Sequence, residues 1–491
     1  MLQGRIFCCG KLAGMVEYFD FSNPTETEDI CMKLRMILAI LLCKGLRLFS
    51  RLVHRGGTAM PGRWALKVCP NLLALLAKDV TSVAVTGTNG KTTSSRMIEE
   101  AVREAGIDCF ANRSGANLIS GITTEFVMNC TLGGKMKKHF AVIECDEAAS
   151  RAVFRQLKPR TIVVTNVFRD QLDRYGEVTH TLGNIREGIS GAPDAVLCLN
   201  ADCSLTASLA DDLPNPVVWY GLEKGAITQG ARSELSDAAY CIRCKTEYDY
   251  DYITYGHLGG FRCPKCGYRR HAADVAVTAV NKQTALGTTI SLRSSADGAE
   301  QTVQVNLPAV YNVYNAAGTW AACLQMGISE DVITRALATF QCGFGRLEHF
   351  DLGAQGTTMM LVKNPAGCNQ VVDFLESMEG PFVLVACLND RGADGTDISW
   401  IWDANFEKLE GMKDRMQHVY VSGDRAADLQ IRMKYAGVPA DIISVEHSYE
   451  KLVEICKAQE VPIYMMPTYT AMLELRQTVI KHCGGTDFWE G

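Results

Sequence analysis

The sequence predicts an α/β protein in which two domains each contain an open, largely parallel β-sheet. Short buried-strand patterns alternate with helical segments along most of the 491 residues, as is typical of parallel sheets with helical connections. A glycine-containing turn near residue 87 joins one such strand directly to a helix. Two CxxC pairs interrupt the alternation between residues 237 and 270. These observations favour a central α/β domain with a cysteine-rich insertion, followed by a smaller α/β domain.

The first 75 residues precede this alternation. We expect residues 1–31 to form a poorly structured extension, and residues 32–75 to form a basic amphipathic helix followed by a connector. The apolar run from Met36 to Cys43 is too short to span a membrane, and lysine and arginine residues flank it. Two interpretations of the helix stay open: it packs on the domain that follows, or it contacts a membrane surface.

The central domain is expected to span residues 76–345. Within it, TSVAV reads as a buried strand, TGTNG as a turn, and Lys91 onward as a helix. Further strand patterns follow in HFAVIEC, TIVVTNV and AVLCLN, and they return after the cysteine segment in TTISLRS and TVQVNL. A helix is expected from about Asn312.

The strand–turn–helix context of GTNGKTT is the one that a phosphate-binding loop requires. Backbone N–H groups of such a turn, together with the helix N-terminus, attract phosphate oxygens. Lys91 is placed to reach the β- and γ-phosphates, and the Thr92 hydroxyl to join a magnesium shell. We therefore predict that ATP is bound by the loop residues Gly87, Thr88, Asn89, Gly90, Lys91, Thr92 and Thr93.

The cysteine segment, residues 237–270, has the spacing C-x2-C-x18-C-x2-C, which is a strong zinc signature. The predicted ligands are Cys241, Cys244, Cys263 and Cys266. Four thiolates complete a tetrahedral shell and leave no position for water, so the predicted Zn²⁺ is structural rather than catalytic. The sequence HLGG between the pairs predicts a tight hairpin, with His257 exposed and not a ligand.

A second α/β alternation begins after Arg346. Strand patterns occur in TTMMLVKN, FVLVACLND, HVYVSGD, IISVEH and VPIYMMP, and two glycines in CGFGR mark the boundary near Cys342–Leu347. We expect residues 346–491 to form a smaller, Rossmann-like C-terminal domain.

The formal net charge of −6 argues against binding to duplex nucleic acid, since such proteins usually carry a basic excess. No nucleic-acid partner is expected. A nucleic-acid-dependent ATPase with a zinc ribbon, and a scaffold without activity, remain as alternatives of other classes.

Six motifs resemble those of the Mur ligase family, whose members use ATP to join an amine to a carboxylate. They are TGTNGKTT, VIECDEA, TNVFRDQLDRYGE, VYNVYNAAG, GRLEHF and KNPAG, the last of which resembles the family's HNP loop. The resemblance implies a P-loop ATPase fold, Glu144 as a magnesium ligand, and nucleotide contacts from Asn315 and Arg346. The chain departs from the amino-acid-adding ligases at Gln171, Met360 and Lys363, so different substrate handling is expected.

The MurT-type branch of the family is similar over nearly the whole chain from Met32, including the four-cysteine insertion and NDRGADGTDISWIWD, Asn389 to Asp403. This resemblance implies ATP-dependent amidation of the α-carboxylate of D-glutamate in lipid II, through an acyl phosphate. Ammonia would come from a GatD-type glutaminase subunit, and the complex would lie in the cytoplasm at the inner face of the membrane. The alternative is a Mur or folylpolyglutamate-type ligase that adds an amino acid.

The resemblance also implies that this chain supplies a carboxylate to the catalytic triad of the glutaminase. The candidates are Asp394, Asp397 and Asp403, of which we favour Asp397 and then Asp403. An acid beside the partner's histidine would orient its ring and stabilise its protonated form. The implied cofactors are ATP, Mg²⁺ and Zn²⁺.

Overall fold

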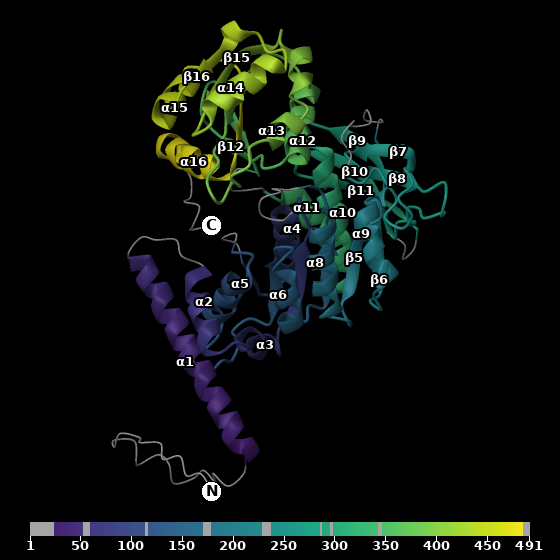
Figure 1. Cartoon of the computed structure of the whole chain (residues 1–491), viewed down its shortest axis with the longest axis vertical. Coiled ribbons are helices and arrows are strands. Elements are labelled where there is room, and N and C mark those ends of the chain that lie inside the picture. Colours follow the sequence, from purple (N-terminus) through teal and green to yellow (C-terminus); the bar gives the residue numbers. More distant parts are fainter. Residues whose placement is uncertain are drawn as a thin grey trace.

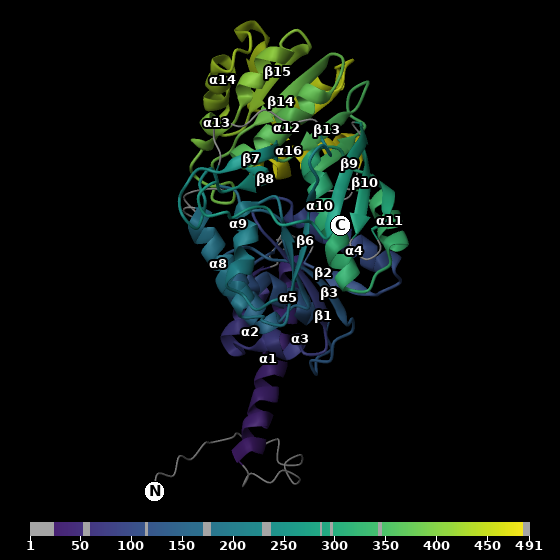
Figure 2. The ribbon, with the colours of Figure 1, turned by 90° about the vertical axis from the view of Figure 1, so that its right-hand side faces the viewer.

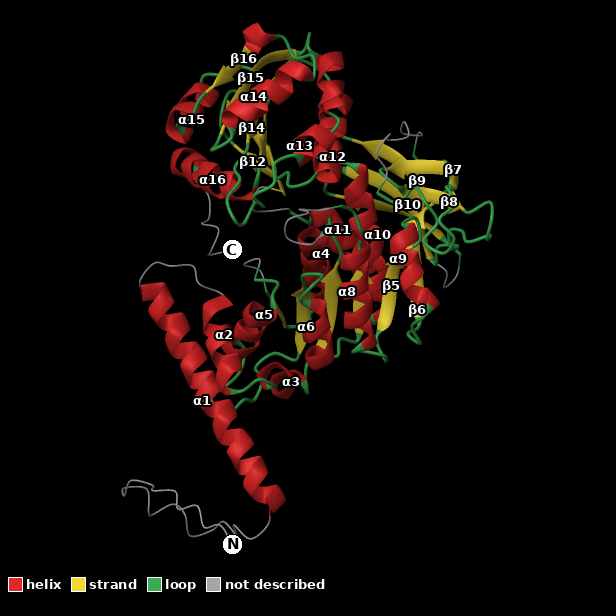
Figure 3. Ribbon diagram, viewed as in Figure 1, coloured by secondary structure: helices red, strands yellow, loops and turns green. Residues whose placement is uncertain are grey.

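The computed structural model describes residues 24–52, 59–112, 116–169, 178–227, 237–284, 287–294, 298–341 and 346–484 (Figure 1). Two bodies follow each other along the chain, and each is a β-sheet with helices packed against it (Figure 3). The predicted α/β architecture is thereby confirmed, although both sheets also contain antiparallel strands.

The central sheet has nine strands in the order β11-β10-β9-β6-β5-β4-β1-β3-β2. Strands β1 to β6 pair in parallel, β6 also pairs in parallel with β9, and the last three strands form an antiparallel edge. The strands are β1 (Thr81–Thr86), β2 (Cys109–Ala111), β3 (Phe140–Glu144), β4 (Thr161–Val164), β5 (Val196–Asn200), β6 (Val217–Leu222), β9 (Val275–Gln283), β10 (Thr288–Ser294) and β11 (Glu300–Val305). The helices are α4 (Lys91–Glu104), α5 (Ile119–Met128), α6 (Ser150–Leu157), α8 (Val178–Ser190), α9 (Ser204–Ala207), α10 (Val310–Gln325) and α11 (Glu330–Thr339), with a 3-10 turn at Ser208–Asp211.

The parallel pairing determines where functional side chains meet. Strand β1 lies between β3 and β4, so the carboxyl ends of all three strands reach the same edge of the sheet. The phosphate loop follows β1, the acidic segment after Glu144 follows β3, and Thr165–Phe168 follows β4. Ligands of open α/β sheets bind at this edge.

The C-terminal domain contains a six-stranded sheet in the order β12-β13-β17-β14-β15-β16, and only β12 is antiparallel to its neighbour. Its strands are β12 (Arg346–Phe350), β13 (Thr357–Met360), β14 (Phe382–Cys387), β15 (Met416–Ser422), β16 (Ile443–Val445) and β17 (Ile463–Pro467). Its helices are α12 (Pro365–Ser377), α13 (Trp400–Asp403), α14 (Ala426–Tyr435), α15 (Tyr449–Lys457) and α16 (Tyr469–Cys483), with 3-10 turns at Phe406–Met412 and Ala440–Ile442. Separate apolar cores fill its two faces.

The N-terminal segment differs from our expectation. Helix α1 (Pro24–Leu52) begins before the predicted boundary at residue 32, while residues 1–23 lie outside the described residues. Part of the expected connector is the first turn of α2 (Ala59–Val68), which is followed by α3 (Leu72–Ala77). Gly62 allows α2 to pack closely on α5. A Cβ at this position would lie 1.9 Å from the carbonyl oxygen of Ser120, so only glycine permits this approach.

The buried face of α1 belongs to the core of the central domain, together with residues of α2 and α3. The interpretation that this helix packs on the following domain is therefore confirmed for one of its faces. Within the described residues, no helix combines the length and the apolar character needed to cross a bilayer.

A two-stranded sheet, β7 (Asp249–Tyr255) and β8 (Leu258–Arg262), lies between β6 and β9 in the sequence and carries the cysteines on either side. We refer to residues 237–270 as the cysteine module. Figures 1 and 2 place β7 and β8 beside the junction of the two domains. The module has its own small apolar cluster, which includes Tyr248, Phe261 and Tyr268.

Candidate functional site

The phosphate loop turns sharply at two glycines. Gly87 and Gly90 have φ angles of +118° and +85°, which L side chains rarely adopt. A Cβ on Gly87 would lie 2.3 Å from Thr165 Oγ1, and one on Gly90 would lie 2.2 Å from Asn315 Oδ1. Helix α4 then begins at Lys91 with no side chain capping its N-terminus. The loop is therefore a tight glycine turn that leads into backbone N–H groups suited to bind an anion.

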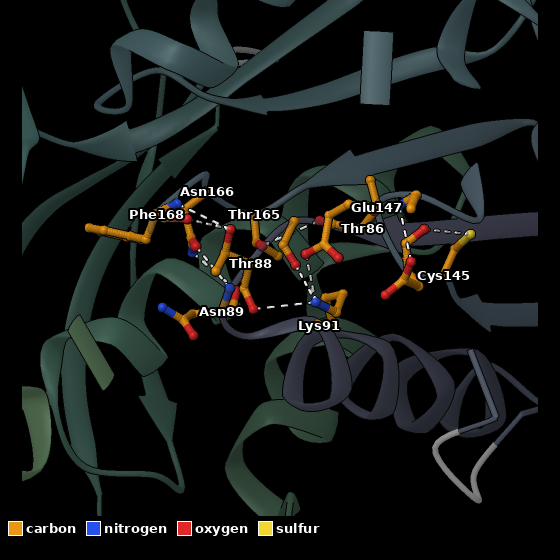
Figure 4. Close-up of polar contacts among 12 residues, drawn as sticks. Thr86, Thr88, Asn89, Lys91, Cys145, Glu147, Thr165, Asn166 and Phe168 are labelled. Atoms are coloured by element: carbon orange, nitrogen blue, oxygen red, sulfur yellow. Dashed lines mark hydrogen bonds and ion pairs between the residues drawn. The ribbon is translucent and has the colours of Figure 1, made fainter. Parts of the chain in front are cut away.

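Residues after β4 brace this loop from the side (Figure 4). The Thr88 amide donates to the Asn166 carbonyl at 2.9 Å, and the Asn89 amide donates to Asn166 Oδ1 at 3.0 Å. Asn166 Nδ2 returns a bond to the Asn89 carbonyl at 3.1 Å. The predicted TNVFRDQLDRYGE motif thus holds the loop through its first residues, whereas residues 170–177, including Gln171, lie outside the described residues.

Lys91 is buried at the centre of the site. Its Nζ donates to the carbonyl oxygens of Gly87 (2.6 Å) and Thr88 (3.3 Å), and it forms an ion pair with Glu147 Oε1 at 2.8 Å. Burial raises the pKa of Glu147, and the positive charge of Lys91 counteracts that rise. Our sequence reasoning missed Glu147, although its position shortly after the end of β3 was a usable signal.

Glu144 is the predicted magnesium ligand on β3. Asn112 holds its backbone on both sides: it accepts from the Glu144 amide at 2.9 Å and donates to the Glu144 carbonyl at 2.7 Å. Its carboxylate is nearly buried and makes no hydrogen bond or ion pair with any residue that the structure describes. Thr92, the second predicted ligand, is half-buried on the first turn of α4. Both side chains are thus available to a cation.

A cleft with an empty volume of about 820 Å³, including its open side, lies between the two domains above the loop. Asn89 and Gly90 line it from the loop, Asn312 and Asn315 from α10, and Lys363 from the C-terminal domain. Asn364 connects the two sides, since its Nδ2 donates to Asn89 Oδ1 at 3.1 Å while its Oδ1 caps α12 through the Gly367 amide at 2.8 Å. The site is therefore completed by both domains.

The structure treats the two residues predicted to contact the nucleotide differently: it describes the side chain of Asn315 but not that of Arg346. Asn315 is buried, accepts from Ser94 Oγ at 3.3 Å and donates to Asn312 Oδ1 at 3.1 Å, beside the cleft. Arg346 is the first residue of β12, and its side chain lies outside the described residues. Asn315 is thus brought to the phosphate loop, while the role of Arg346 stays a prediction.

The cysteine module also reaches this cleft. Tyr255, at the end of β7, is one of the lining residues. Its ring stacks on Phe168 with centroids 5.7 Å apart and meets Tyr314 of α10 edge-on at 5.7 Å. The module is therefore in contact with the segment that braces the phosphate loop.

The four cysteines of the module converge as predicted. All four sulfur atoms lie within 4.8 Å of one another, with 3.5 Å between Cys241 and Cys266 and 3.4 Å between Cys244 and Cys263. The Cys266 amide also points at Cys263 Sγ at 3.5 Å. Sulfur atoms around a zinc ion with bonds of about 2.3 Å stand about 3.8 Å apart, so this cluster has suitable dimensions.

The prediction that His257 is exposed was wrong. His257 is 1% exposed, its Nε2 lies 3.3 Å from Cys203 Sγ, and its ring packs 4.5 Å from that of Phe168. The turn between β7 and β8 points into the central domain rather than into solvent, and it carries His257 inward. The histidine anchors the module and is not part of the cysteine cluster.

The three candidate acids of the C-terminal domain have different surroundings. Asp394 is buried and bound by the amide (2.7 Å) and hydroxyl (2.5 Å) of Thr470. Asp397 is half-buried and accepts from the Ser399 amide at 2.8 Å. Asp403 lies on α13 and faces Arg169 of the central domain, with 3.4 Å between charged atoms. Asp394 is thus used within the fold, while Asp397 and Asp403 lie nearer the surface.

Comparison with known proteins identifies the family. The Mur ligase middle domain matches residues 85–248, and the MurT ligase C-terminal domain matches residues 361–472. Subunit MurT of the glutamine-hydrolysing lipid II isoglutaminyl synthase of Streptococcus pneumoniae is 33% identical over 91% of this chain and 97% of its own length. Its counterpart from Staphylococcus aureus is 34% identical over 92% and 99%. The chain belongs to the MurT family.

Membership of the MurT family confirms the resemblance predicted from the motifs and assigns the chain to a ligase family. Solved structures show the same fold at low sequence identity. MurF from Acinetobacter baumannii is 15% identical with a TM-score of 0.62, covering 85% of this chain and 80% of that one. Mycobacterium tuberculosis folylpolyglutamate synthase, solved with ADP, is 13% identical with a TM-score of 0.59, covering 85% and 93%.

Proposed function

We propose that this MurT-family chain uses ATP to amidate the α-carboxylate of D-glutamate in the stem peptide of lipid II. The observation that carries the proposal is the cleft itself, in which the phosphate loop of one domain is joined to the other domain through Asn364. Such a cleft brings a nucleotide and a second substrate together. The names of the relatives supply the substrate class.

The residues present suit a nucleotide and its metal. The backbone amides at the uncapped start of α4 and the Lys91 ammonium would hold the phosphates, because Lys91 is already positioned by the Gly87 carbonyl and by Glu147. Thr92 and Glu144 would ligate Mg²⁺, which offsets charge on the transferred phosphoryl group. Asn315, and Arg346 as predicted from the family motif, would contact the nucleotide.

The chemistry proceeds in two steps. A carboxylate oxygen of the substrate attacks the γ-phosphorus of ATP, ADP leaves, and an acyl phosphate is formed. Ammonia then attacks the acyl carbon, the C–O bond to phosphate breaks, and the amide is released after loss of one proton. Lys91 stabilises the charge that develops on the transferred group, and the walls that both domains contribute to the cleft limit the access of water to the acyl phosphate.

Ammonia has to arrive unprotonated, so we propose a GatD-type glutaminase as the partner subunit. Asp397, with Asp403 as the second choice, would complete the partner's triad by orienting its histidine. The arrangement around Asp394 does not favour it for this role, since both of its oxygens are bound by Thr470.

We further propose that the cysteine module is an inserted zinc ribbon with Cys241, Cys244, Cys263 and Cys266 as ligands. The ion would stabilise the module by linking its two ends. The convergence of the four sulfur atoms within 4.8 Å of one another supports this assignment.

Substitution Cys263→Ser is expected to remove bound zinc and to lower the unfolding midpoint by about 5 °C, because a structural site contributes folding free energy. Zinc content by elemental analysis and a thermal scan would measure both effects. Cys31→Ser, at an exposed cysteine outside the cluster, is the matched control. Unchanged zinc content in Cys263→Ser would contradict the four-ligand assignment.

Tyr255→Ala is expected to raise the KM for ATP about tenfold, which is the usual size of an aromatic stacking contribution to a base, with a smaller change in kcat. The reason is that Tyr255 offers a ring to the cleft beside Asn312 and Asn315. Tyr255→Phe should retain the wild-type KM. Tyr240→Ala, at an exposed tyrosine of the same module, controls for general effects on the module.

The complex is proposed to act in the cytoplasm, at the inner face of the membrane where lipid II is anchored. The decisive test incubates the chain and a co-purified glutaminase with lipid II, ATP and glutamine, and follows the mass of the product. Replacement of one hydroxyl by an amino group on each stem is expected. Incorporation of an added amino acid instead would establish the alternative ligase activity, and no mass change with either glutamine or ammonia would refute amidation.

A further inference from the structure

Helix α1 carries two apolar faces on opposite sides. One face is buried in the central domain through Ala39, Ile40 and Cys43. The other forms a stripe of Leu34, Leu38, Leu41, Leu42, Leu48 and Phe49, each with between 36% and 62% of its surface exposed. Spacings of three, four and seven residues align these six side chains along one side of the helix. We call this set the exposed stripe.

The exposed stripe has no cover among the residues that the structure describes. None of its side chains belongs to the apolar clusters of either domain. Figures 1 and 2 show α1 running along the flank of the central domain beside α2 and projecting beyond it at its N-terminal end. Met60 and Trp64 of the neighbouring α2 are also exposed. A row of exposed apolar side chains along one helix face indicates a binding partner.

From Ile30 onward the charges of α1 beside the stripe are all positive, whereas three acids, Glu26, Glu28 and Asp29, precede it in the first turns of the helix. Lys33 and Arg35 are exposed, and helical geometry places them on opposite sides of the stripe. Lys44 continues the row on the side of Lys33, and its Nζ donates to the Cys130 carbonyl at 2.8 Å. The sequence from Ile30 to Arg55 contains no aspartate or glutamate. The surface is therefore an apolar ridge between cations.

We propose that the exposed stripe docks α1 in the plane of an anionic phospholipid bilayer. Leucine and phenylalanine side chains enter the acyl boundary, while lysine and arginine at both margins contact lipid phosphates. The buried face of α1 keeps the central domain attached to the helix. Charge favours this occupant over a second copy of the chain, because two such stripes would bring like charges together.

Docking by α1 would place the chain on the surface that holds its lipid-linked substrate, and this consequence rests on the proposed function. The docking surface itself is argued from exposure and charge alone. Binding and catalysis are therefore measured separately.

The test is sedimentation of the full-length chain with vesicles of phosphatidylglycerol and phosphatidylcholine, compared with vesicles of phosphatidylcholine alone. The wild-type chain is expected to bind the anionic vesicles, and binding is expected to weaken with salt. The triple variant Leu38→Gln, Leu41→Gln, Phe49→Gln should lower the vesicle partition coefficient more than about tenfold. The variant Lys33→Glu, Arg35→Glu should lose binding with retention of the thermal unfolding midpoint.

The matched control is Ile431→Gln with Val445→Gln, which removes exposed apolar side chains from the C-terminal domain. It should bind like the wild type. Failure of the wild-type chain to sediment with anionic vesicles would overturn the proposal. The proposal would also be overturned if the wild-type chain were a dimer that the triple substitution converts to a monomer. The same holds if the triple variant could not form a complex with the glutaminase.

Activity distinguishes the two proposals. The triple variant should amidate a water-soluble, short-chain lipid II analogue at the wild-type rate and should lose activity on lipid II in anionic vesicles. A wild-type chain that binds vesicles but amidates neither substrate would refute the proposed function and leave the docking surface intact.

Discussion

Lys91→Met is expected to reduce ATP-dependent amidation at least about a thousandfold, because removal of a charge aimed at the transferred phosphoryl group costs several kcal/mol of transition-state stabilisation. The position of Lys91 supports this, since its Nζ is held by two carbonyls of the phosphate loop and by Glu147. ATP- and ammonia-dependent product formation would be measured under single-turnover and steady-state conditions.

Lys91→Met should also change the stability of the fold, because Lys91 forms an ion pair with Glu147. The pKa of Glu147 gives the direction of this change. Burial raises the pKa of Glu147 above its ordinary value, so the folded state favours the protonated acid. The stability of the fold therefore decreases as the pH rises from the ordinary pKa through the raised one. Without the Lys91 charge the raised pKa moves further upward, and Lys91→Met should lose more stability at neutral than at acidic pH.

A double variant separates the two effects. Lys91→Met with Glu147→Gln should regain thermal stability at neutral pH, because no buried carboxyl remains to ionise, yet should stay inactive. Lys224→Met, at an exposed lysine, is the control for loss of a charge. Wild-type turnover in Lys91→Met would exclude Lys91 from the chemistry.

Asp397→Asn is expected to lower glutamine hydrolysis by the complex by about 10³- to 10⁴-fold, the loss seen when a triad carboxylate becomes an amide. Asparagine retains the bond from the Ser399 amide, so the local turn should persist. Ammonia-dependent amidation should be unaffected, since the ATP site lies elsewhere in the chain. Glutamine hydrolysis and ammonia-dependent turnover would be measured on the same preparation.

Substitutions of the two neighbouring acids, Asp403 and Asp394, show whether the effect is specific to Asp397. Asp403→Asn removes an ion pair with Arg169 and tests the second candidate in the same assay. Asp394→Asn should chiefly lower stability, because it disturbs the two bonds to Thr470. Full glutamine hydrolysis in both Asp397→Asn and Asp403→Asn would contradict a triad role for this segment.

Local patterns were sufficient for the parts of the site that are contiguous in sequence. The phosphate loop depends on φ angles at Gly87 and Gly90 and on the helix that starts at Lys91, all within a few residues. The cysteine spacing likewise predicted the cluster, because two short turns present the sulfur atoms in pairs. The motif resemblance led to the MurT family, which the comparisons confirm.

Contacts between distant segments were decided only by the tertiary structure. Glu147 beside Lys91, Asn364 on Asn89 and Tyr255 in the cleft join residues of different strands, domains or modules. His257 shows the limit most clearly, since HLGG correctly indicates a turn but does not reveal that this turn is buried. Solvent exposure depends on what packs against a segment, and local sequence does not contain that information.

Helix α1 was determined partly by its local sequence and partly by the tertiary structure. The sequence by itself determined a basic, apolar helix that is too short in its apolar run to cross a bilayer. Because apolar residues occur on both sides of the helix, periodicity alone does not distinguish the face that packs from the face that stays exposed. Only packing against the central domain decides this: it buries Ile40 and Cys43 and leaves Leu38 and Phe49 facing solvent, since one helix can present only one side to a single core.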